Sequence, residues 1–279
     1  TWQRNKHNPL ISGPPPGMDV FGFRDPFVFR RDNTWYLLEG SGIKGQGGTI
    51  LVYRSEDLHS WKYLGPLLSG LGKEDQVWEV PEVFRLGSKD VLTYSPTKES
   101  RFTRYFQGRF DNGKFHPESR GKIDLGGRFY AATSFQDAAN RRIMIAWVRE
   151  ARSKEAVLKA GWSGLLSVPR ILSLGSDQTL KVRPIPEIET LRAGLKSASN
   201  IPLLSGASEP LAGVNGDALD IEAEFEPGDS TRFGLKVLAS PDGREETTIY
   251  YDRQTSRLMM DSTRSSLSNE VSKEVIGDV

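Results

Sequence analysis

The sequence contains no cysteine and only three histidines among its 279 residues. Without cysteine the chain forms no disulfides and offers no thiolate nucleophile, so its composition leaves the redox compartment open. The histidines, His7, His59 and His116, lie too far apart to form a ligand pair within one element, and no His-Glu-x-x-His pattern occurs. We therefore predict no metal centre and no cofactor.

Neither sign of charge predominates, because 37 Lys and Arg residues stand against 36 Asp and Glu residues, a net charge of +1. That balance argues against the single-sign field that nucleic acids or acidic membranes require. No apolar run approaches the roughly 20 residues that span a bilayer, and no charged-then-apolar leader opens the chain. We therefore expect a soluble protein, secreted or cytoplasmic, whose partner is neutral and is neither nucleic acid nor membrane.

Glycine and aromatic residues are plentiful, with 28 Gly and 10% aromatics, and this mixture favours β-structure. Short alternating apolar runs separated by turn residues begin near residues 25, 79 and 129, and each cycle predicts four antiparallel strands. A period of about 50 residues is typical of four-stranded propeller blades. The first cycle predicts strands at 26–31, 34–38 and 49–53 and a fourth ending near 66. The second predicts them at 81–86, 91–95 and 104–110 and from 115, and the third at 129–135, 142–148, 164–174 and 180–182.

In a propeller the inner strands line a central funnel, so groups at the entry of each first strand converge. Asp25, Glu79 and the segment 124–130 occupy that place, and we predict that they meet at one end of the funnel. The chain opens with the tail of a blade and holds about three and a half blades, whereas propellers usually close with four or more. The rest of the ring is then missing or lies on another chain.

The C-terminal third has a different organisation. Residues 184–191 are predicted to leave the propeller, and the Ala-, Gly-, Ser- and Pro-rich stretch 193–213 to form a linker. Period-two alternation then predicts strands at 218–225, 232–239, 247–251 and 258–261, the front of a β-sandwich. The predicted domains are thus a partial propeller at 1–192, a linker at 193–213 and a partial sandwich at 214–279.

Four motifs together resemble glycoside hydrolase family 32, the family of invertases, fructan β-fructosidases and related fructosyltransferases. They are Gly22-Phe-Arg-Asp-Pro-Phe27, Val77-Trp-Glu-Val-Pro81, Phe129-Tyr-Ala-Ala-Thr-Ser-Phe135 and Gly161-Trp-Ser-Gly-Leu-Leu-Ser-Val-Pro-Arg170, in the order and approximate spacing of that family. The resemblance covers residues 1–192, and more loosely 249–252 and 265–268. It implies an all-β chain in which a five-bladed propeller precedes a β-sandwich.

The resemblance also implies roles for individual residues. Glu79 matches the general acid/base, and Asp25 matches the aspartate that holds fructosyl hydroxyls and stabilises the transition state, with Arg24 beside it. Asp124 and Arg128 resemble positions that contact the leaving-group side, although Gly126 and Gly127 leave the alignment of Asp124 open by one position.

Two aromatic residues near these motifs have alternative interpretations. Tyr130 belongs either to the sugar pocket or to the core. Trp162, in a Gly-rich loop, either lines the sugar site or packs locally. The charged loop 149–159 is more typical of a solvated flap than of a substrate clamp.

The family's nucleophile is an aspartate in an Asn-Asp-Pro-Asn-Gly type motif, and no such motif occurs in these 279 residues. Either the chain lacks its N-terminal portion through truncation or cleavage, or a second chain supplies it; a homo-oligomer is also open. One hypothesis is a retaining hydrolase that releases terminal β-D-fructofuranosyl units from sucrose, fructo-oligosaccharides or fructans. The alternatives are a catalytically incomplete sugar-binding half, and an arabinan- or xylan-acting enzyme of a neighbouring five-bladed family.

Overall fold

The computed structural model describes residues 3–68, 73, 75–97, 102–204, 211 and 213–277, so 205–210 and 212 of the predicted linker lie outside the described residues. The contacts divide the chain into two units. The first unit contains residues 1–150 and 164–185, and the second contains 151–163 and 186–279. In the described part of the chain, no helix has the length and apolar character needed to cross a membrane.

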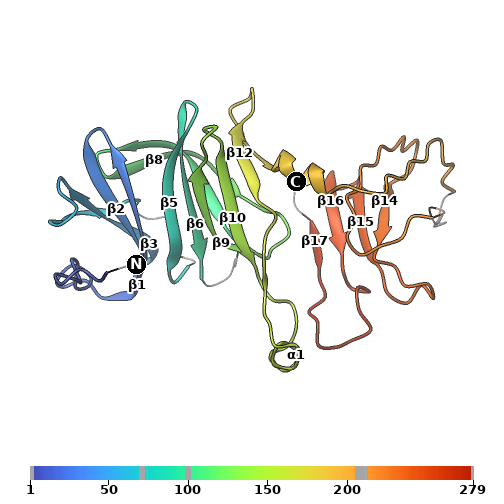
Figure 1. The fold of residues 1–279 in the computed structure, drawn as a ribbon, viewed down its shortest axis with the longest axis horizontal. Helices are drawn as coiled ribbons and strands as arrows, with labels where there is room; N and C mark the ends of the chain where they lie inside the picture. The colour runs from blue at the N-terminus through green and yellow to red at the C-terminus, as the bar shows by residue number, and fades with distance from the viewer. Residues whose placement is uncertain are drawn as a thin grey trace. The chain divides into compact units, whose positions relative to one another are not determined.

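The first unit is built from three antiparallel groups of strands that follow one another along the chain, here called the first, second and third sheets; in Figure 1 their colours run from blue through teal and green to yellow. The first sheet contains β1 (Val20–Arg31), β2 (Thr34–Ile43), β3 (Gly47–Ser55) and β4 (Lys62–Pro66). The second contains β5 (Trp78–Leu86), β6 (Lys89–Pro96), β7 (Arg104–Asp111) and β8 (Lys114–Lys122). In both, each strand pairs with its sequence neighbour, and one pair, Ser41 with Trp78, joins the two sheets.

The third sheet has five strands because two short strands take the place of one. It contains β9 (Phe129–Gln136), β10 (Arg142–Val148), β11 (Leu165–Leu166), β12 (Arg170–Leu174) and β13 (Leu180–Pro184). β11 pairs with the end of β10 and β12 with its beginning, so the two together occupy the place of one strand. All three sheets therefore have the order of a propeller blade, with four consecutive strand positions. The predicted strand at 164–174 is two strands, β11 and β12.

Consecutive apolar side chains explain why these segments form sheets that are buried on both faces. In β5, Val83 packs toward the first sheet and the next residue, Phe84, toward the third. In β6, Leu92 and Val91 divide in the same way. Because successive side chains of a strand point to opposite faces, a run without polar gaps fills two cores at once.

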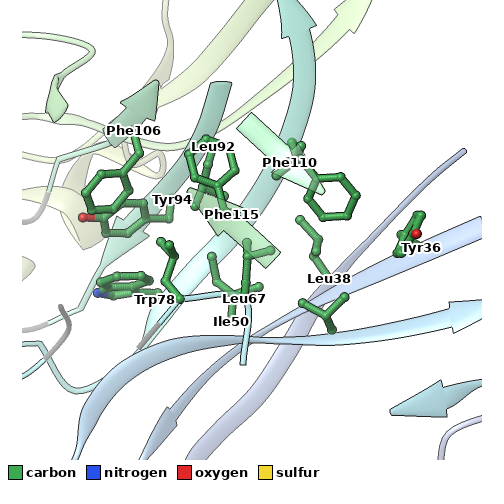
Figure 2. Close-up of a cluster of buried hydrophobic side chains, with 13 residues drawn as sticks. Tyr36, Leu38, Ile50, Leu67, Trp78, Leu92, Tyr94, Phe106, Phe110 and Phe115 are labelled. Atoms are coloured by element: carbon green, nitrogen blue, oxygen red, sulfur yellow. The ribbon is translucent and has the colours of Figure 1, made fainter. Parts of the chain in front are cut away.

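The larger core lies between the first and second sheets. It gathers buried side chains from β2, β3, β5, β6, β7 and β8, and Figure 2 shows Trp78, Tyr94 and Phe106 together at one end and Phe110 near Leu38 at the other. The Trp78 and Tyr94 rings lie 4.1 Å apart. This packing fixes the start of β5, where Trp78 directly precedes Glu79, and so it fixes the position of that carboxylate.

Two predictions for the first 160 residues are wrong in detail. No strand occurs between residues 3 and 19, where the tail of a blade was expected. The predicted loop 149–159 contains a helix, α1 (Lys154–Ala160). Ser153 caps the helix by accepting a hydrogen bond from the Ala156 N–H at 3.2 Å, and Gly161 ends it in the left-handed region at φ 76°.

The segment 151–163 belongs to the second unit, although it lies between two strands of the first in sequence. Arg152 forms an antiparallel bridge with Val271, and the Ser153 N–H donates to the Glu270 carbonyl. The second unit also contains the 3-10 helix η1 (Pro186–Leu191). Its sheet has the order β14 (Arg232–Val237), β15 (Thr247–Asp252), β16 (Arg257–Asp261) and β17 (Val275–Gly277).

Residues 218–225 form no strand, which contradicts the sequence prediction. Their alternation is real, but Leu219 and Ile221 remain 47% and 45% exposed. A strand needs a paired neighbour and a buried face in addition to alternation. β17, which was not predicted, has both because it pairs with β16.

Candidate active site

The inner strand of the first sheet carries an irregularity in its pairing with β2. Arg24 pairs with Gly40 and Phe27 pairs with Leu38, so Asp25 and Pro26 together stand opposite the single residue Glu39. Two residues against one define a β-bulge, which bends the strand and redirects its side chains.

The same bulge recurs at the same place in the other two sheets. Val80 and Pro81 stand opposite Tyr94, and Ala131 and Ala132 stand opposite Ala146. The first residue of each bulge has a positive φ: 62° for Asp25, 49° for Val80 and 52° for Ala131. Positive φ is uncommon outside glycine. Three instances at equivalent positions indicate a repeated bulge that sets the direction of the preceding side chain.

The residues that precede the three bulges meet. Arg24 Nη1 lies 3.0 Å from Glu79 Oε1, and the Tyr130 hydroxyl donates to Glu79 Oε2 at 2.6 Å. Each oxygen of Glu79 therefore has one donor, from a different neighbouring sheet. The Glu79 side chain is 16% exposed and that of Arg24 is 52% exposed, so the group is accessible to a solute.

Asp25 is held by the backbone of the second sheet. Its Oδ2 accepts a hydrogen bond from the Val80 N–H at 3.1 Å. Because Val80 directly follows Glu79 in β5, this bond places the Asp25 carboxylate beside the backbone that carries Glu79. The third sheet repeats this contact with a different acceptor, because the Ala131 N–H donates to Ser95 Oγ at 3.0 Å. Thus the bulge N–H groups of the second and third sheets each donate to a side chain of the sheet before, and no described group donates a hydrogen bond to the other oxygen of Asp25.

Gly40 makes the close approach of the first and second sheets feasible. A Cβ at this position would lie 2.6 Å from the Trp78 carbonyl oxygen and 3.0 Å from that of Arg24. The first distance is shorter than side-chain carbons adopt and the second is tighter than most, so a larger residue would force the backbones of the two sheets apart.

Burial and neighbouring charge raise the pKa of Tyr130 above its ordinary value. Burial is the largest cause, followed by the hydrogen bond to Glu79, while the Arg149 guanidinium lowers the pKa in part. Tyr130 therefore stays neutral and acts as a hydrogen-bond donor. The Arg149 guanidinium lies 5.2 Å from the Tyr130 ring and 5.8 Å from the Trp147 ring, which adds a cation and an indole to this side of the site.

Glu39 is a titratable residue of this region that the sequence analysis did not single out. It is only 5% exposed, and burial together with the charge of Asp25 raises its pKa from 4.5 to about 7. The available signal was an acidic residue inside an otherwise apolar strand. Its relation to Asp25 depends on the register of β1 and β2.

Other predicted site residues make contacts elsewhere. Asp124 accepts a hydrogen bond from the Gly126 N–H and forms an ion pair with Arg170, both at 2.7 Å. Arg128 donates to the Glu150 carbonyl at 3.1 Å. The leaving-group roles of Asp124 and Arg128 stay predictions.

Trp162 belongs to the second unit, where its ring stacks under the Arg152 guanidinium at 3.8 Å; its place in the sugar site stays a prediction.

Glu82, three residues beyond Glu79, is 4% exposed. It accepts hydrogen bonds from the N–H and the hydroxyl of Ser134, at 2.9 and 2.6 Å, and so ties the second sheet to the third. No group of three or more His, Asp and Glu residues in the described part of the chain is arranged to hold a metal ion.

Comparison with known proteins places this geometry in a family. Residues 1–184 match the model described as Glycosyl hydrolases family 32 N-terminal domain, and residues 187–277 match the one described as Glycosyl hydrolases family 32 C terminal. The chain belongs to glycosyl hydrolase family 32. Its fold is accordingly part of the family 32 propeller followed by the C-terminal β-sandwich, as the motifs predicted.

The family 32 chain is similar to several enzymes over part of their length. It is 33% identical over 271 residues to a sucrose-6-phosphate hydrolase of Zymomonas mobilis, covering 90% of this chain and 52% of that protein. It is 31% identical over 290 residues to a levanase of Bacillus subtilis, covering 95% and 41%. The chain thus spans about half the length of these curated relatives.

Solved structures of related enzymes have a similar fold and are likewise matched over only part of their length. Fructan 1-exohydrolase IIa from Cichorium intybus, solved in complex with 1-kestose, superposes with a TM-score of 0.78 at 26% identity, covering 98% of this chain and 62% of that one. A β-fructofuranosidase variant from Bombyx mori, solved with sucrose, has a TM-score of 0.71 at 24% identity, covering 99% and 57%, and supports the shared fold.

Proposed function

We propose that the complete protein is a retaining glycoside hydrolase that releases terminal β-D-fructofuranosyl units from sucrose or fructans. The observation that carries the proposal is that Arg24 and Tyr130, from two different sheets, bind the partly exposed Glu79 carboxylate, while Asp25 binds the N–H of Val80, the next residue. Membership of family 32, and relatives named sucrose-6-phosphate hydrolase, levanase and fructan exohydrolase, support the same substrate class.

Glu79 is the proposed general acid/base. Cleavage of a glycoside requires one carboxyl group that protonates the departing oxygen and later takes a proton from water. Because Arg24 and Tyr130 occupy one oxygen of Glu79 each, the carboxylate is held in one rotamer before substrate enters. The glycosidic oxygen must take the place of one of these partners, and the exposed Arg24 is the easier to displace.

Asp25 is the proposed anion that stabilises the oxocarbenium-like transition state. Its bond to the Val80 N–H leaves the rest of the carboxylate available for fructosyl hydroxyls. The bulge holds this side chain in place through a strained backbone, so little ordering is required when the sugar binds. Arg24, which directly precedes Asp25 in the chain, forms an ion pair with Glu79.

The nucleophile of a retaining mechanism is a second carboxylate about 5 to 5.5 Å from the acid. The family's Asn-Asp-Pro-Asn-Gly type motif does not occur in these 279 residues. This observation supports a second candidate function, in which the 279-residue chain by itself binds fructosides without cleaving them. Under that hypothesis calorimetry detects sucrose binding and no product is released.

Activity measurements on the full-length protein test the proposal. Glu79→Gln should lower kcat/KM for sucrose by about 100- to 10,000-fold, because it removes proton transfer to the leaving group. A fructoside with an aryl leaving group, which needs less protonation, should lose far less. Glu56→Gln, an exposed glutamate in the turn after β3, is the matched control. Equal losses on both substrates, or near-normal rates with sucrose, would remove Glu79 from the acid/base role.

A substrate panel separates the remaining alternative. Sucrose, inulin and levan report fructosyl release, whereas an aryl arabinofuranoside reports the arabinan- or xylan-acting activity. Turnover of the arabinofuranoside alone would overturn the fructoside proposal.

A further inference from the structure

Glu39 occupies a position that repeats in all three sheets, opposite the bulge. The second and third sheets have Tyr94 and Ala146 there, which carry no charge at neutral pH. Only the first sheet has a carboxyl group at this place, and only the first sheet has a carboxylate, Asp25, in the bulge itself. Residues opposite one another in adjacent antiparallel strands have Cβ atoms roughly 5 Å apart. The register therefore puts two carboxyl groups across from one another.

The surroundings of Glu39 offer it no compensating partner among the described residues. In the β2–β3 ladder it stands opposite Leu51. The titratable groups that act on it are Asp25 from β1 and Tyr53 from β3, whose own pKa rises to about 12 through burial and the charges of Tyr63 and Glu39. No described group donates a hydrogen bond to the Glu39 carboxyl.

The remaining neighbours on this face of the first sheet are apolar or neutral. Ile11 and Met18, from the segment before β1, pack against Leu37, Leu51 and Tyr53. The ring of Tyr63, from β4, is tilted against that of Tyr53 with 5.3 Å between centroids, and both hydroxyls are buried with no hydrogen-bond partner among the described residues. A carboxyl group in such a setting is most stable when it is neutral.

We propose that Glu39 is a positioning residue for Asp25: the neutral form leaves Asp25 bound to the Val80 N–H and able to hold sugar hydroxyls, whereas the ionised form repels Asp25 and weakens sugar binding. This inference rests on the proposed function, because it concerns the sugar that Asp25 holds. It adds a group that touches neither the sugar nor the reacting atoms and acts through the bulge.

Proton uptake on sugar binding tests the proposal directly. The full-length Glu79→Gln variant, which leaves sucrose intact, is titrated with sucrose by calorimetry in buffers of different ionisation enthalpy. Since the pKa of Glu39 is about 7, binding at pH 7 should take up about half a proton. The dissociation constant should rise up to about tenfold between pH 6 and pH 8, for the same reason.

Adding Glu39→Gln to that background should abolish the proton uptake and hold the dissociation constant within about twofold across the same range. Adding Glu56→Gln instead should change neither quantity. Sucrose binding without proton uptake, or uptake that persists in the Glu39→Gln variant, overturns this inference and leaves the proposed function standing. If the Glu39→Gln variant does not fold, the proton uptake measured with the Glu79→Gln variant alone still tests the inference. A protein that binds no fructoside at all overturns both.

Discussion

Replacing Glu39 by Gln tests the burial of this carboxyl group without any assumption about function. Gln has nearly the same shape and cannot ionise, so the variant isolates the charge. The measured quantity is the free energy of unfolding of the 279-residue chain as a function of pH, for the wild type and the variant.

The pKa of Glu39 is raised from 4.5 to about 7, and each unit corresponds to about 1.36 kcal/mol, so the largest contribution is about 3 kcal/mol. The folded state binds the proton more tightly than the unfolded state. The stability due to this proton is therefore fully present below pH 4.5 and is lost as pH rises through about 7. In the Gln variant this loss is absent.

Thermal unfolding followed by circular dichroism measures the difference. A contribution of about 3 kcal/mol corresponds to about 6 to 12 °C in a domain of this size. The melting temperature of Glu39→Gln relative to wild type should thus rise by about that amount between pH 4.5 and pH 8, while Glu56→Gln tracks the wild type. A difference that does not change with pH would refute the buried, unpaired state of Glu39.

Three further predictions concern other groups of the first unit. Tyr130→Phe removes the donor to Glu79 Oε2, and loss of a hydrogen bond to a charged group, about 1.5 to 3 kcal/mol, should lower kcat/KM of the full-length protein about 10- to 150-fold. Glu82→Ala leaves the Ser134 N–H without its acceptor and should lower the free energy of unfolding by about 3 kcal/mol in urea titrations. Burial alone would raise the pKa of Asp90. Hydrogen bonds from Arg31 and the Phe110 N–H, together with the charges of Arg31 and Arg85, lower that pKa on balance. The stability that Asp90 provides is therefore present above pH 3.8 and is lost as pH falls. Asp90→Asn should therefore destabilise the chain by about 3 kcal/mol at pH 7 and by progressively less toward pH 3, the opposite pH dependence to Glu39.

Each of these variants has a matched control. Tyr250→Phe changes a tyrosine of the second unit, and Glu56→Ala and Asp111→Asn change exposed acidic residues. Wild-type activity in Tyr130→Phe would show that this hydroxyl does not support Glu79. Losses no larger than in the controls would show that Glu82 and Asp90 do not hold the sheets together.

The strands of the first unit could be predicted from the sequence because their signals are local. Alternating apolar residues and turns such as Asn112-Gly113 specify a hairpin within a few residues. The convergence of Asp25 and Glu79 was also predictable, since repeating blades place equivalent positions side by side. α1 was missed although its caps, Ser153 and Gly161, were visible in the sequence.

The sequence by itself determined which residue types stand at the entry of each inner strand and that the strands repeat. Tertiary structure alone decided how those side chains pair: that Arg24 binds Glu79, that Asp25 binds the Val80 N–H, and that Glu39 faces Asp25. The physical reason is the β-bulge, which shifts the register by one residue and turns a side chain toward a different neighbour. Such a shift depends on packing between strands that are distant in sequence, and no local pattern records it.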